Sequence, residues 1–436
     1  MISVTICRPA LSGQLTVTAL LLAACAAPPT PISAPVNTGA TPSAAPTTTS
    51  TTTVVAAPAA LPPVAAPAAP VAPILPFDDA VLSAAQTLLG KASLPAGVAR
   101  HALVVDPLID GVTGMQSNAT QAMGTKLAEL IRKSYPQYDL QAFNSPNLAK
   151  SPLVLVGTFT GVNVERKSEG QRSAYRICLA LADLKSGKLV SKGLAFSAKD
   201  NVDITPTAFF RDAPAWVEDP ATSGYVRTCQ GTRVGDAIHP AYLERIQSAA
   251  QISEAIDAYA AGRYAAALKL YNEVAATPSG KQLRVYSGQY MSNLRLGHRS
   301  AAAQAFGQIV EQGLASKRLG VKLLFKPGTT AFWNDPKGMP TPYPLMLNEI
   351  GMRASKLQSC MEVVGHTSPN GPEPMNERLS LRRAEQVRTE LLRTAKPLAQ
   401  RVIASGAGSR EAMIGNGRDD ASDALDRRVE FKVVAC

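Results

Sequence analysis

The pattern of apolar and polar residues changes several times along the chain and divides it into regions. In residues 77–240, short apolar runs bounded by turn residues predict β-strands at 102–105, 152–164, 174–184 and 189–197. Residues 117–134 instead place four apolar side chains on one face of a helix: Ala122, Leu127, Leu130 and Ile131. A strand, a helix and then a meander of strands predict an α/β domain.

Residues 241–318 have the apolar spacing of helices, and small and aromatic residues recur in them 35 positions apart. The recurring positions are Gly262, Ala267, Tyr271 and Val274, followed by Gly297, Ala302, Phe306 and Ile309. The pattern resembles tetratricopeptide repeats, in which glycine permits a tight turn, alanine lets helices approach and the aromatic ring fills the gap. Because about three repeats make a free-standing array, we expect a TPR-like helical connector packed on a neighbouring domain. A peptide-binding groove is the alternative interpretation.

Residues 319–436 combine both patterns. Strands are expected at 321–326, 361–365, 401–406 and 427–435, with helices at 344–359 and 376–395. The second helix carries an apolar stripe that should face the sheet: Ala384, Val387, Leu391 and Ala395. The order of these strands and helices predicts a βαβαββ sandwich of sheet and helices. For the whole chain, the three regions predict a multi-domain α+β fold.

Two sequence blocks in this last region carry the most specific information. The first, residues 362–384, reads EVVGHTSPNGPEPMNERLSLRRA, and the second, Asp426 to Glu430, reads DRRVE. Together they resemble the OmpA-like peptidoglycan-binding domain, whose pattern is GHTD, a glycine, NxxLSxxRA and then NRRVE. The resemblance implies recognition rather than catalysis: a pocket that holds the diamino acid of the peptidoglycan stem peptide.

The resemblance also assigns roles to individual residues. The arginine of LSxxRA, which pairs with a ligand carboxylate, falls on Arg383; a planar guanidinium meets a carboxylate with two parallel hydrogen bonds. A loss of this side chain is expected to cost ligand binding and to leave the fold intact. The other candidate ligand-binding residues are Thr367, Ser368, Asn376, Arg427 and Arg428. Asn376 is also the expected N-cap of the second helix, His366 is expected to pack or to orient the loop, and one of the two arginines to pair with Asp426 or Glu430.

The chain departs from the pattern at one position, because Ser368 stands where the family has aspartate. In the family that aspartate receives the amine of the diamino acid, and a serine hydroxyl cannot form an ion pair with it. Glu373 or Glu377 is the candidate to supply the missing charge. The departure keeps a second function open, in which the domain is a protein-interaction module of a secretion, pilus or flagellar assembly.

The first 76 residues have the features of an exported, lipid-anchored protein. Residues 1–24 carry one charge, Arg8, and a mostly apolar run that ends in Leu-Ala-Ala before Cys25, which is typical of a secretory signal. The LAAC tetrapeptide resembles a lipobox and implies lipidation of Cys25. Residues 25–76 have no charge and are rich in proline, alanine and threonine, so we expect a disordered tether. The predicted location is the outer membrane, lipid-anchored and facing the periplasm.

Charge and cysteine content agree with export. The formal net charge of +11 is spread along the chain rather than concentrated in a basic block, so we expect no nucleic-acid partner. Peptidoglycan, the outer membrane and other envelope proteins are the expected partners. After removal of Cys7 and lipidation of Cys25, an even number of cysteines favours two disulfides, and the domain boundaries favour Cys178 with Cys229 and Cys360 with Cys436.

No feature of the sequence predicts an enzyme. GxSxG, HExxH and an intact phosphate-binding loop do not occur, and the four histidines are scattered. We therefore expect a non-catalytic scaffold without metal or cofactor. By pattern alone, residues 77–240 are similar to the periplasmic α/β domain of curli-secretion and flagellar lipoproteins. Their aromatic-rich segment 204–231 is expected to be a self-packed Ω-loop, with a partner-binding loop as the alternative.

Overall fold

The computed structural model describes residues 72–94, 97–168, 172–215, 219–334, 339–358, 360–412, 423 and 426–436. The predicted signal peptide, Cys25 and nearly all of the predicted tether lie outside these residues. Within the described residues, no helix is both long enough and apolar enough to cross a membrane.

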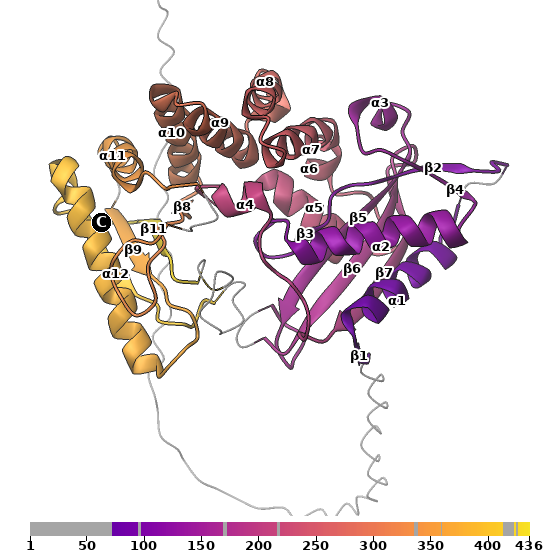
Figure 1. The fold of residues 1–436 in the computed structure, drawn as a ribbon, viewed down its shortest axis with the longest axis horizontal. Helices are drawn as coiled ribbons and strands as arrows, with labels where there is room; N and C mark the ends of the chain where they lie inside the picture. The colour runs from indigo at the N-terminus through magenta and orange to yellow at the C-terminus, as the bar shows by residue number, and fades with distance from the viewer. Residues whose placement is uncertain are drawn as a thin grey trace, which may run out of the picture. The chain divides into compact units, whose positions relative to one another are not determined.

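A seven-stranded mixed sheet forms the centre of the first domain (Figure 1). Its strands follow the order β1-β7-β6-β5-β2-β4, and β3 pairs with β5 outside this path. The bounds are β1 Ile74–Leu75, β2 His101–Val105, β3 Ile109–Asp110, β4 Tyr138–Gln141, β5 Leu153–Val162, β6 Ala174–Asp183 and β7 Lys188–Ser197. The long strands β5 and β6 are almost entirely buried, because helices cover both faces of the sheet.

The two faces of this sheet have separate apolar cores. On one face pack α1 (Phe77–Gly90) and α2 (Asn118–Ser134), which lie side by side in Figure 1. On the other face pack α3 (Ser145–Leu148), α5 (Pro220–Gln230), α6 (Pro240–Leu243) and the start of α7. The predicted helix 117–134 is thus confirmed as α2, and Ser117 caps it by accepting from the backbone N–H of Thr120.

The segment 204–231 is not a self-packed loop, which corrects the prediction. It contains α4 (Ala208–Asp212) and α5, which meet different neighbours. α4 inserts Phe209 and Phe210 into the core of the helical region, where the Phe209 ring lies 6.0 Å from the ring of Tyr259 and 6.1 Å from that of Tyr271. Phe209 and Phe210 therefore serve a contact between two regions of this chain.

Four helices form the region after the first domain: α7 (Ile246–Ala260), α8 (Tyr264–Ala275), α9 (Leu283–Arg295) and α10 (Arg299–Ala315). Gly262 and Gly297 lie in the turns of the two hairpins with φ of +74° and +78°, a conformation that glycine adopts without strain. A short 3-10 helix, η1 (Pro278–Gly280), joins the hairpins. These helices share one apolar core with α4 and with the C-terminal domain, so the predicted packing on a neighbour is present.

Asp212, at the end of α4, makes polar contacts with two other parts of the chain. Its buried carboxylate accepts hydrogen bonds from the hydroxyl of Tyr259 at 2.8 Å, from Nη2 of Arg295 at 2.8 Å and from the backbone N–H of Met339 at 3.0 Å. Nearby, the buried Nζ of Lys322 donates to the carbonyl of Phe210. Burial lowers the pKa of Lys322 to about 7.

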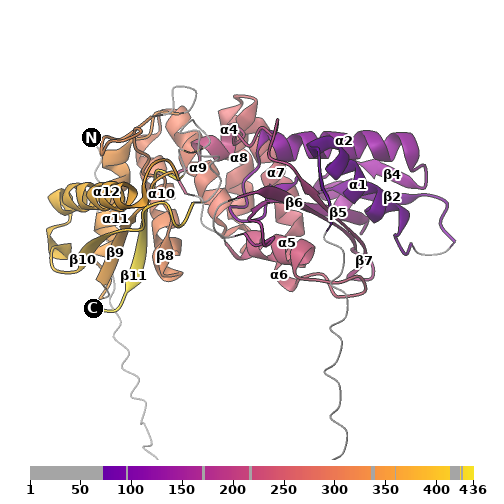
Figure 2. The same cartoon turned by 90° about the horizontal axis from the view of Figure 1, so that it is seen from below.

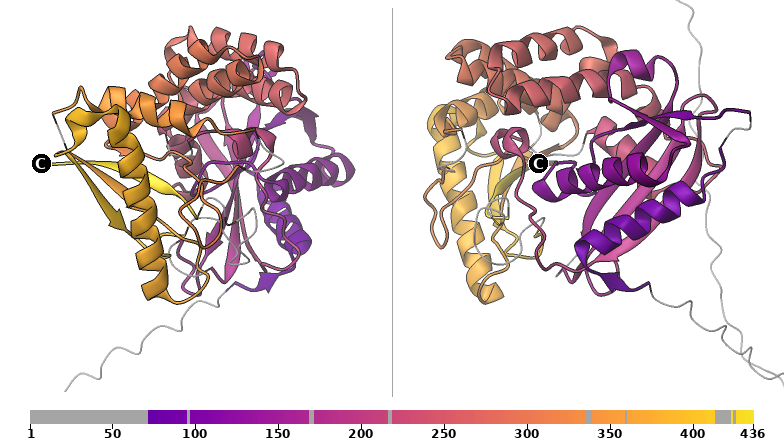
Figure 3. Two further views of the ribbon diagram at one scale, coloured as in Figure 1. Left: turned by 60° about the vertical axis from the view of Figure 1, so that its left-hand side comes forward. Right: turned by 45° about the vertical axis from the view of Figure 1, so that its right-hand side comes forward.

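The C-terminal domain is a four-stranded sheet with two helices on one face. Figure 2 shows the strands side by side in the order β10-β9-β11-β8, and Figure 3 shows α12 running along the sheet. The elements are β8 (Arg318–Leu319), α11 (Tyr343–Ala354), β9 (Cys360–Gly365), α12 (Glu373–Thr394), η2 (Lys396–Leu398), β10 (Val402–Gly406) and β11 (Val429–Val434). The predicted stripe Ala384, Val387, Leu391 and Ala395 is buried.

Two boundaries differ from the predictions. The predicted first strand, 321–326, contributes only isolated bridges, whereas regular pairing with β11 occurs at Arg318 and Leu319. The helix α12 begins at Glu373, so Asn376 lies in its first turn and is not the N-cap; Pro372 occupies that position. A proline near the start costs a helix little, because the first turn leaves its N–H groups unpaired in any case.

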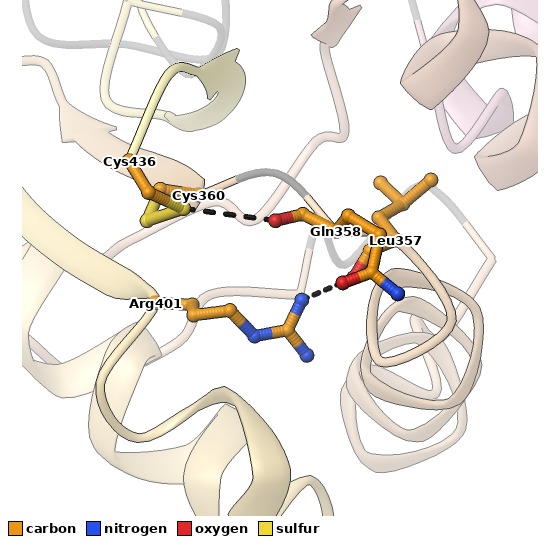
Figure 4. The surroundings of a disulfide bond; sticks show 5 residues. All are labelled: Leu357, Gln358, Cys360, Arg401 and Cys436. Carbon is orange, nitrogen blue, oxygen red and sulfur yellow. Dashed lines mark hydrogen bonds between the residues drawn. A yellow bond between two sulfur atoms is a disulfide. The ribbon is translucent and has the colours of Figure 1, made fainter.

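The cysteines form one of the two predicted disulfides. Cys360 at the start of β9 bonds to Cys436 next to the end of β11, with 4.9 Å between the Cα atoms (Figure 4). The guanidinium of Arg401 lies nearby and donates to the carbonyl of Leu357. The prediction for Cys178 and Cys229 is wrong: both are free and buried, and the thiol of Cys178 on β6 donates to the carbonyl of Cys229 on α5 at 2.9 Å.

Candidate functional site

The loop after β9 and the first turns of α12 bring the first sequence block together. Gly365 ends β9 and lets this strand lie against α12, because a Cβ atom at that position would lie 1.9 Å from the carbonyl oxygen of Ser380. The hydroxyl of Ser380 accepts from the backbone N–H of Gly408 at 3.0 Å and so ties the loop after β10 to the same helix. The strand, the helix and both loops therefore meet at the GHTS sequence.

Arg383 lies at the centre of this arrangement and is fully buried. Its guanidinium donates from Nε to the carbonyl of Thr329 at 2.9 Å, from Nη1 to that of His366 at 3.2 Å and from Nη2 to that of Lys326 at 3.2 Å. It also stacks 5.2 Å from the centre of the Phe325 ring. Arg383 thus joins the segment before α11 to the motif loop, a structural role that the sequence did not indicate.

His366 and Thr367 have buried polar atoms without a hydrogen-bond partner among the described residues. These atoms are both ring nitrogens of His366 and the hydroxyl oxygen of Thr367. The two residues are 0% and 3% exposed. A buried polar atom without a partner costs on the order of 1–3 kcal/mol. Donors and acceptors held in this way, next to Arg383, are what a polar ligand of the motif loop would pair with.

The second sequence block supplies a buried ion pair behind the motif loop. Arg428 contacts Glu430 through Nε at 2.8 Å and Nη2 at 2.6 Å, and Arg318 lies 3.2 Å from the other oxygen of the same carboxylate. Arg428 therefore has the structural pairing that the sequence left open. Arg427 donates from Nε to the carbonyl of Phe325 at 3.2 Å. Arg427 and Arg383 therefore both bond to the backbone of residues 325–329.

The two glutamates that were expected to replace the missing aspartate have other partners. Glu373 accepts from the backbone N–H of Ser409 at 3.0 Å and from its hydroxyl. Glu377 forms an ion pair with Arg410. Ser368 itself is buried in the motif loop, and Asn376 donates from its side chain to the carbonyl of Gly371 at 3.4 Å. Both carboxylates thus hold the loop after β10 against the start of α12.

Three residues near the motif loop have the composition of a metal site. A ring nitrogen of His366 lies 3.8 Å from Glu411 and the other lies 3.7 Å from Glu430, so one oxygen faces each side of the ring. Burial, and then the charges of Arg428, Lys432 and Arg318, lower the pKa of His366 to about 2. These three positively charged side chains outnumber the two carboxylates, so the net local charge is positive and repels a divalent cation. The charge therefore opposes metal binding at these residues.

The lowered pKa of this histidine should make the stability of the domain depend on pH. Because the unfolded chain titrates at the ordinary histidine pKa of about 6.5 and the folded domain at about 2, the free energy of unfolding falls as the pH drops below about 6.5. Between pH 7 and pH 5 the wild type should lose about 2 kcal/mol relative to His366→Gln, which does not titrate.

Urea unfolding of both proteins at each pH measures this difference. Asp106 has the opposite effect, since burial raises its pKa to about 7, but it is present in both proteins and cancels. Parallel pH profiles would show that the His366 ring is protonated as easily in the folded domain as in the unfolded chain.

The comparison with protein families decides the identity of this region. Residues 324–424 match the OmpA family model. The C-terminal region is an OmpA-family domain. No curated protein matches the chain.

Solved structures are similar to the same part of the chain. The peptidoglycan-associated lipoprotein from Burkholderia pseudomallei is 22% identical, with 28% of this chain and 91% of that chain covered and a TM-score of 0.22. The periplasmic domain of Helicobacter pylori MotB is 20% identical, with 27% and 72% covered and a TM-score of 0.22. The cell wall anchor of the type VI secretion system from Pseudomonas aeruginosa is 21% identical, with 30% and 97% covered and a TM-score of 0.22. Each likeness covers under a third of this chain and concerns the fold alone.

Proposed function

We propose that this protein is a non-catalytic envelope lipoprotein whose OmpA-family domain binds the stem peptide of peptidoglycan. One observation carries the proposal: the family match falls on the residues that place the unpartnered atoms of His366 and Thr367 beside Arg383. A stem peptide presents carboxylates and amides, which pair with hydroxyl and imidazole groups.

The remaining parts of the chain supply the rest of the proposed role. Cys25 is the proposed lipid anchor in the outer membrane, and residues 25–76 are the proposed tether. The α/β domain and the four helices, with their TPR-like spacing, are the proposed contacts to other envelope proteins. Replacement of Cys25 by serine should release the protein into the soluble periplasm; a serine variant that remains in the membrane fraction excludes this anchor.

A second function rests on Ser368. Without the family's aspartate the pocket loses a charge-assisted bond of about 1–2 kcal/mol, and a domain that no longer holds peptidoglycan can serve as an interaction module. In that case the domain binds a protein of a secretion, pilus or flagellar assembly.

A pull-down with purified peptidoglycan sacculi separates the two functions. The wild type should bind, and Thr367→Val, which removes only the unpartnered hydroxyl, should weaken binding about 5- to 10-fold. Thr389→Val, at an exposed position on α12, is the matched control and should bind as the wild type does. If wild type and Ser368→Asp both fail to bind sacculi, the interaction-module function replaces wall binding.

A further inference from the structure

Apolar side chains stay exposed at one end of the sheet in the α/β domain. Ile74 of β1, Leu194 of β7 and Val164 in the turn after β5 are 48%, 56% and 74% exposed. Ile74 is the cross-strand partner of Phe196, and Leu194 is that of Cys178, which packs in the core under α5. Because paired residues direct their side chains to the same face, Leu194 lies on the face that α5 covers further along. This end of that face is open.

Three basic side chains lie beside these apolar residues. The guanidinium of Arg166 lies 4.0 Å from the centre of the Phe196 ring, and Arg176 is the cross-strand partner of Phe196 on β6. Lys192 precedes Leu194 by two positions, on the same face of β7. The hydrogen bonds of the three cations go to uncharged oxygens, those of Ala72, Gln230 and Thr232. These contacts therefore leave the three positive charges uncompensated.

The carboxylates near this end of the sheet do not neutralise the open face. Three belong to the opposite face, either in the first turn of α1 or bonded to the start of α2: Asp78, Asp79 and Asp203. Two more lie in turns, each next to a basic residue: Glu165 before Arg166, and Asp200 after Lys199. The open face therefore combines exposed apolar side chains with a positive charge.

The segment that leads to Cys25 leaves the domain at the same place. Nη2 of Arg166 donates to the carbonyl of Ala72 at 3.1 Å, and β1 pairs with the end of β7 two residues later. The chain between Cys25 and Ala72 can span at most roughly 160 Å. If Cys25 is anchored in a membrane, as the proposed function has it, the open face stays within reach of that membrane at a raised effective concentration.

We propose that this surface docks the α/β domain on anionic phospholipid. The surface, called here the Leu194 patch, consists of Ile74, Val164, Arg166, Arg176, Lys192 and Leu194. Each basic side chain near an anionic bilayer strengthens binding about fivefold, and the exposed apolar side chains leave water at the head-group boundary. The inference rests on the proposed lipid anchor and adds a second, reversible membrane contact. Without the anchor this contact is screened by salt, so the Cys25→Ser variant still washes off the membrane fraction.

Sedimentation with lipid vesicles at low ionic strength tests the patch. The protein is the whole chain from residue 25 with Cys25→Ser, so that neither an acyl chain nor the predicted signal peptide contributes. It should bind vesicles of phosphatidylglycerol and phosphatidylcholine at least about 20-fold more tightly than phosphatidylcholine alone. Leu194→Glu should weaken binding to the anionic vesicles about tenfold, and Val164→Glu, at a still more exposed position, about fivefold. Ile403→Glu is the matched control, because Ile403 is 57% exposed on a strand of the other domain, and it should bind as the parent protein does.

The outcomes separate this inference from the proposed function. Equal binding to both kinds of vesicle, or an equal loss from Leu194→Glu and Ile403→Glu, overturns the inference. Binding to polyglutamate but not to anionic vesicles also overturns it, because the patch then recognises an acidic polypeptide. Leu194→Glu should bind sacculi as the parent protein does, since the C-terminal domain is unchanged. Sacculus binding without vesicle binding therefore overturns only the inference, and vesicle binding without sacculus binding overturns only the proposed wall binding.

Discussion

Replacement of Arg383 by alanine should unfold or strongly destabilise the C-terminal domain, with a loss of about 3–5 kcal/mol in the free energy of unfolding. The side chain is fully buried and donates to three carbonyls, those of Lys326, Thr329 and His366. Alanine leaves these acceptors without that donor and opens a cavity beside the ring of Phe325. The expectation from the sequence, that the fold survives this change, does not hold for a side chain in this position.

Arg382→Ala is the matched control, because Arg382 is the neighbouring residue of α12 and is exposed. It should change the stability by less than about 0.5 kcal/mol. Arg383→Lys should retain only part of the stability. The lysine ammonium keeps the positive charge, but it lacks the planar fork with which the guanidinium reaches several carbonyls. Urea unfolding followed by circular dichroism measures all three variants. If Arg383→Ala loses less than about 1 kcal/mol, the hydrogen bonds of Arg383 do not support the fold, and sacculus binding by that variant then isolates its role in recognition.

Removal of the Cys360–Cys436 disulfide should have the second largest effect. The bond closes a loop with a sequence separation of 76 residues, and the chain-entropy relation gives about 4.5 kcal/mol for a loop of that size. Measured effects are commonly about 2–4 kcal/mol, so Cys360→Ser with Cys436→Ser should lower the stability by that amount. Thermal unfolding with and without a reductant measures it.

The two remaining cysteines provide the control for this experiment. Cys178→Ala and Cys229→Ala together should lose as much stability on addition of reductant as the wild type does, because both thiols are already free and the Cys360–Cys436 bond is retained. Alkylation of the denatured, unreduced protein should label Cys178 and Cys229 and leave Cys360 and Cys436 unlabelled. Labelling of all four would show that the C-terminal bond is absent, and labelling of none of the four would restore the second predicted disulfide.

Local sequence patterns were sufficient to predict much of the fold. The strands β5, β6 and β7 and the helix α2 lie where the periodicity places them, since long amphipathic or apolar stretches leave few alternatives. The repeated glycines mark the turns of both helical pairs for the same reason. Cys360 and Cys436 pair because β9 and β11 are antiparallel neighbours.

The features that the sequence did not predict depend on contacts between distant segments. Whether Arg383 faces solvent or the interior is decided by carbonyls at positions 326 and 329, more than fifty residues away. α4 is only five residues long, so its helix depends on the aromatic contacts of Phe209 rather than on local propensity. Cys178 and Cys229 are close in space, but the thiol of Cys178 is directed to a backbone carbonyl. Neither spacing nor composition carries this information.

The position of the disulfide has a mechanical consequence for a protein that joins wall and membrane. Under the proposed function, tension enters the domain at the motif loop after β9 and leaves toward the N-terminus through β8. In the sheet, β11 lies between these two strands, so the load crosses the hydrogen bonds of β9 with β11. Those bonds alone can separate one after another under a pulling force. Because Cys360 of β9 is bonded to Cys436 beyond β11, a covalent link bypasses them, and the strand pair should resist extension until the chain elsewhere has yielded.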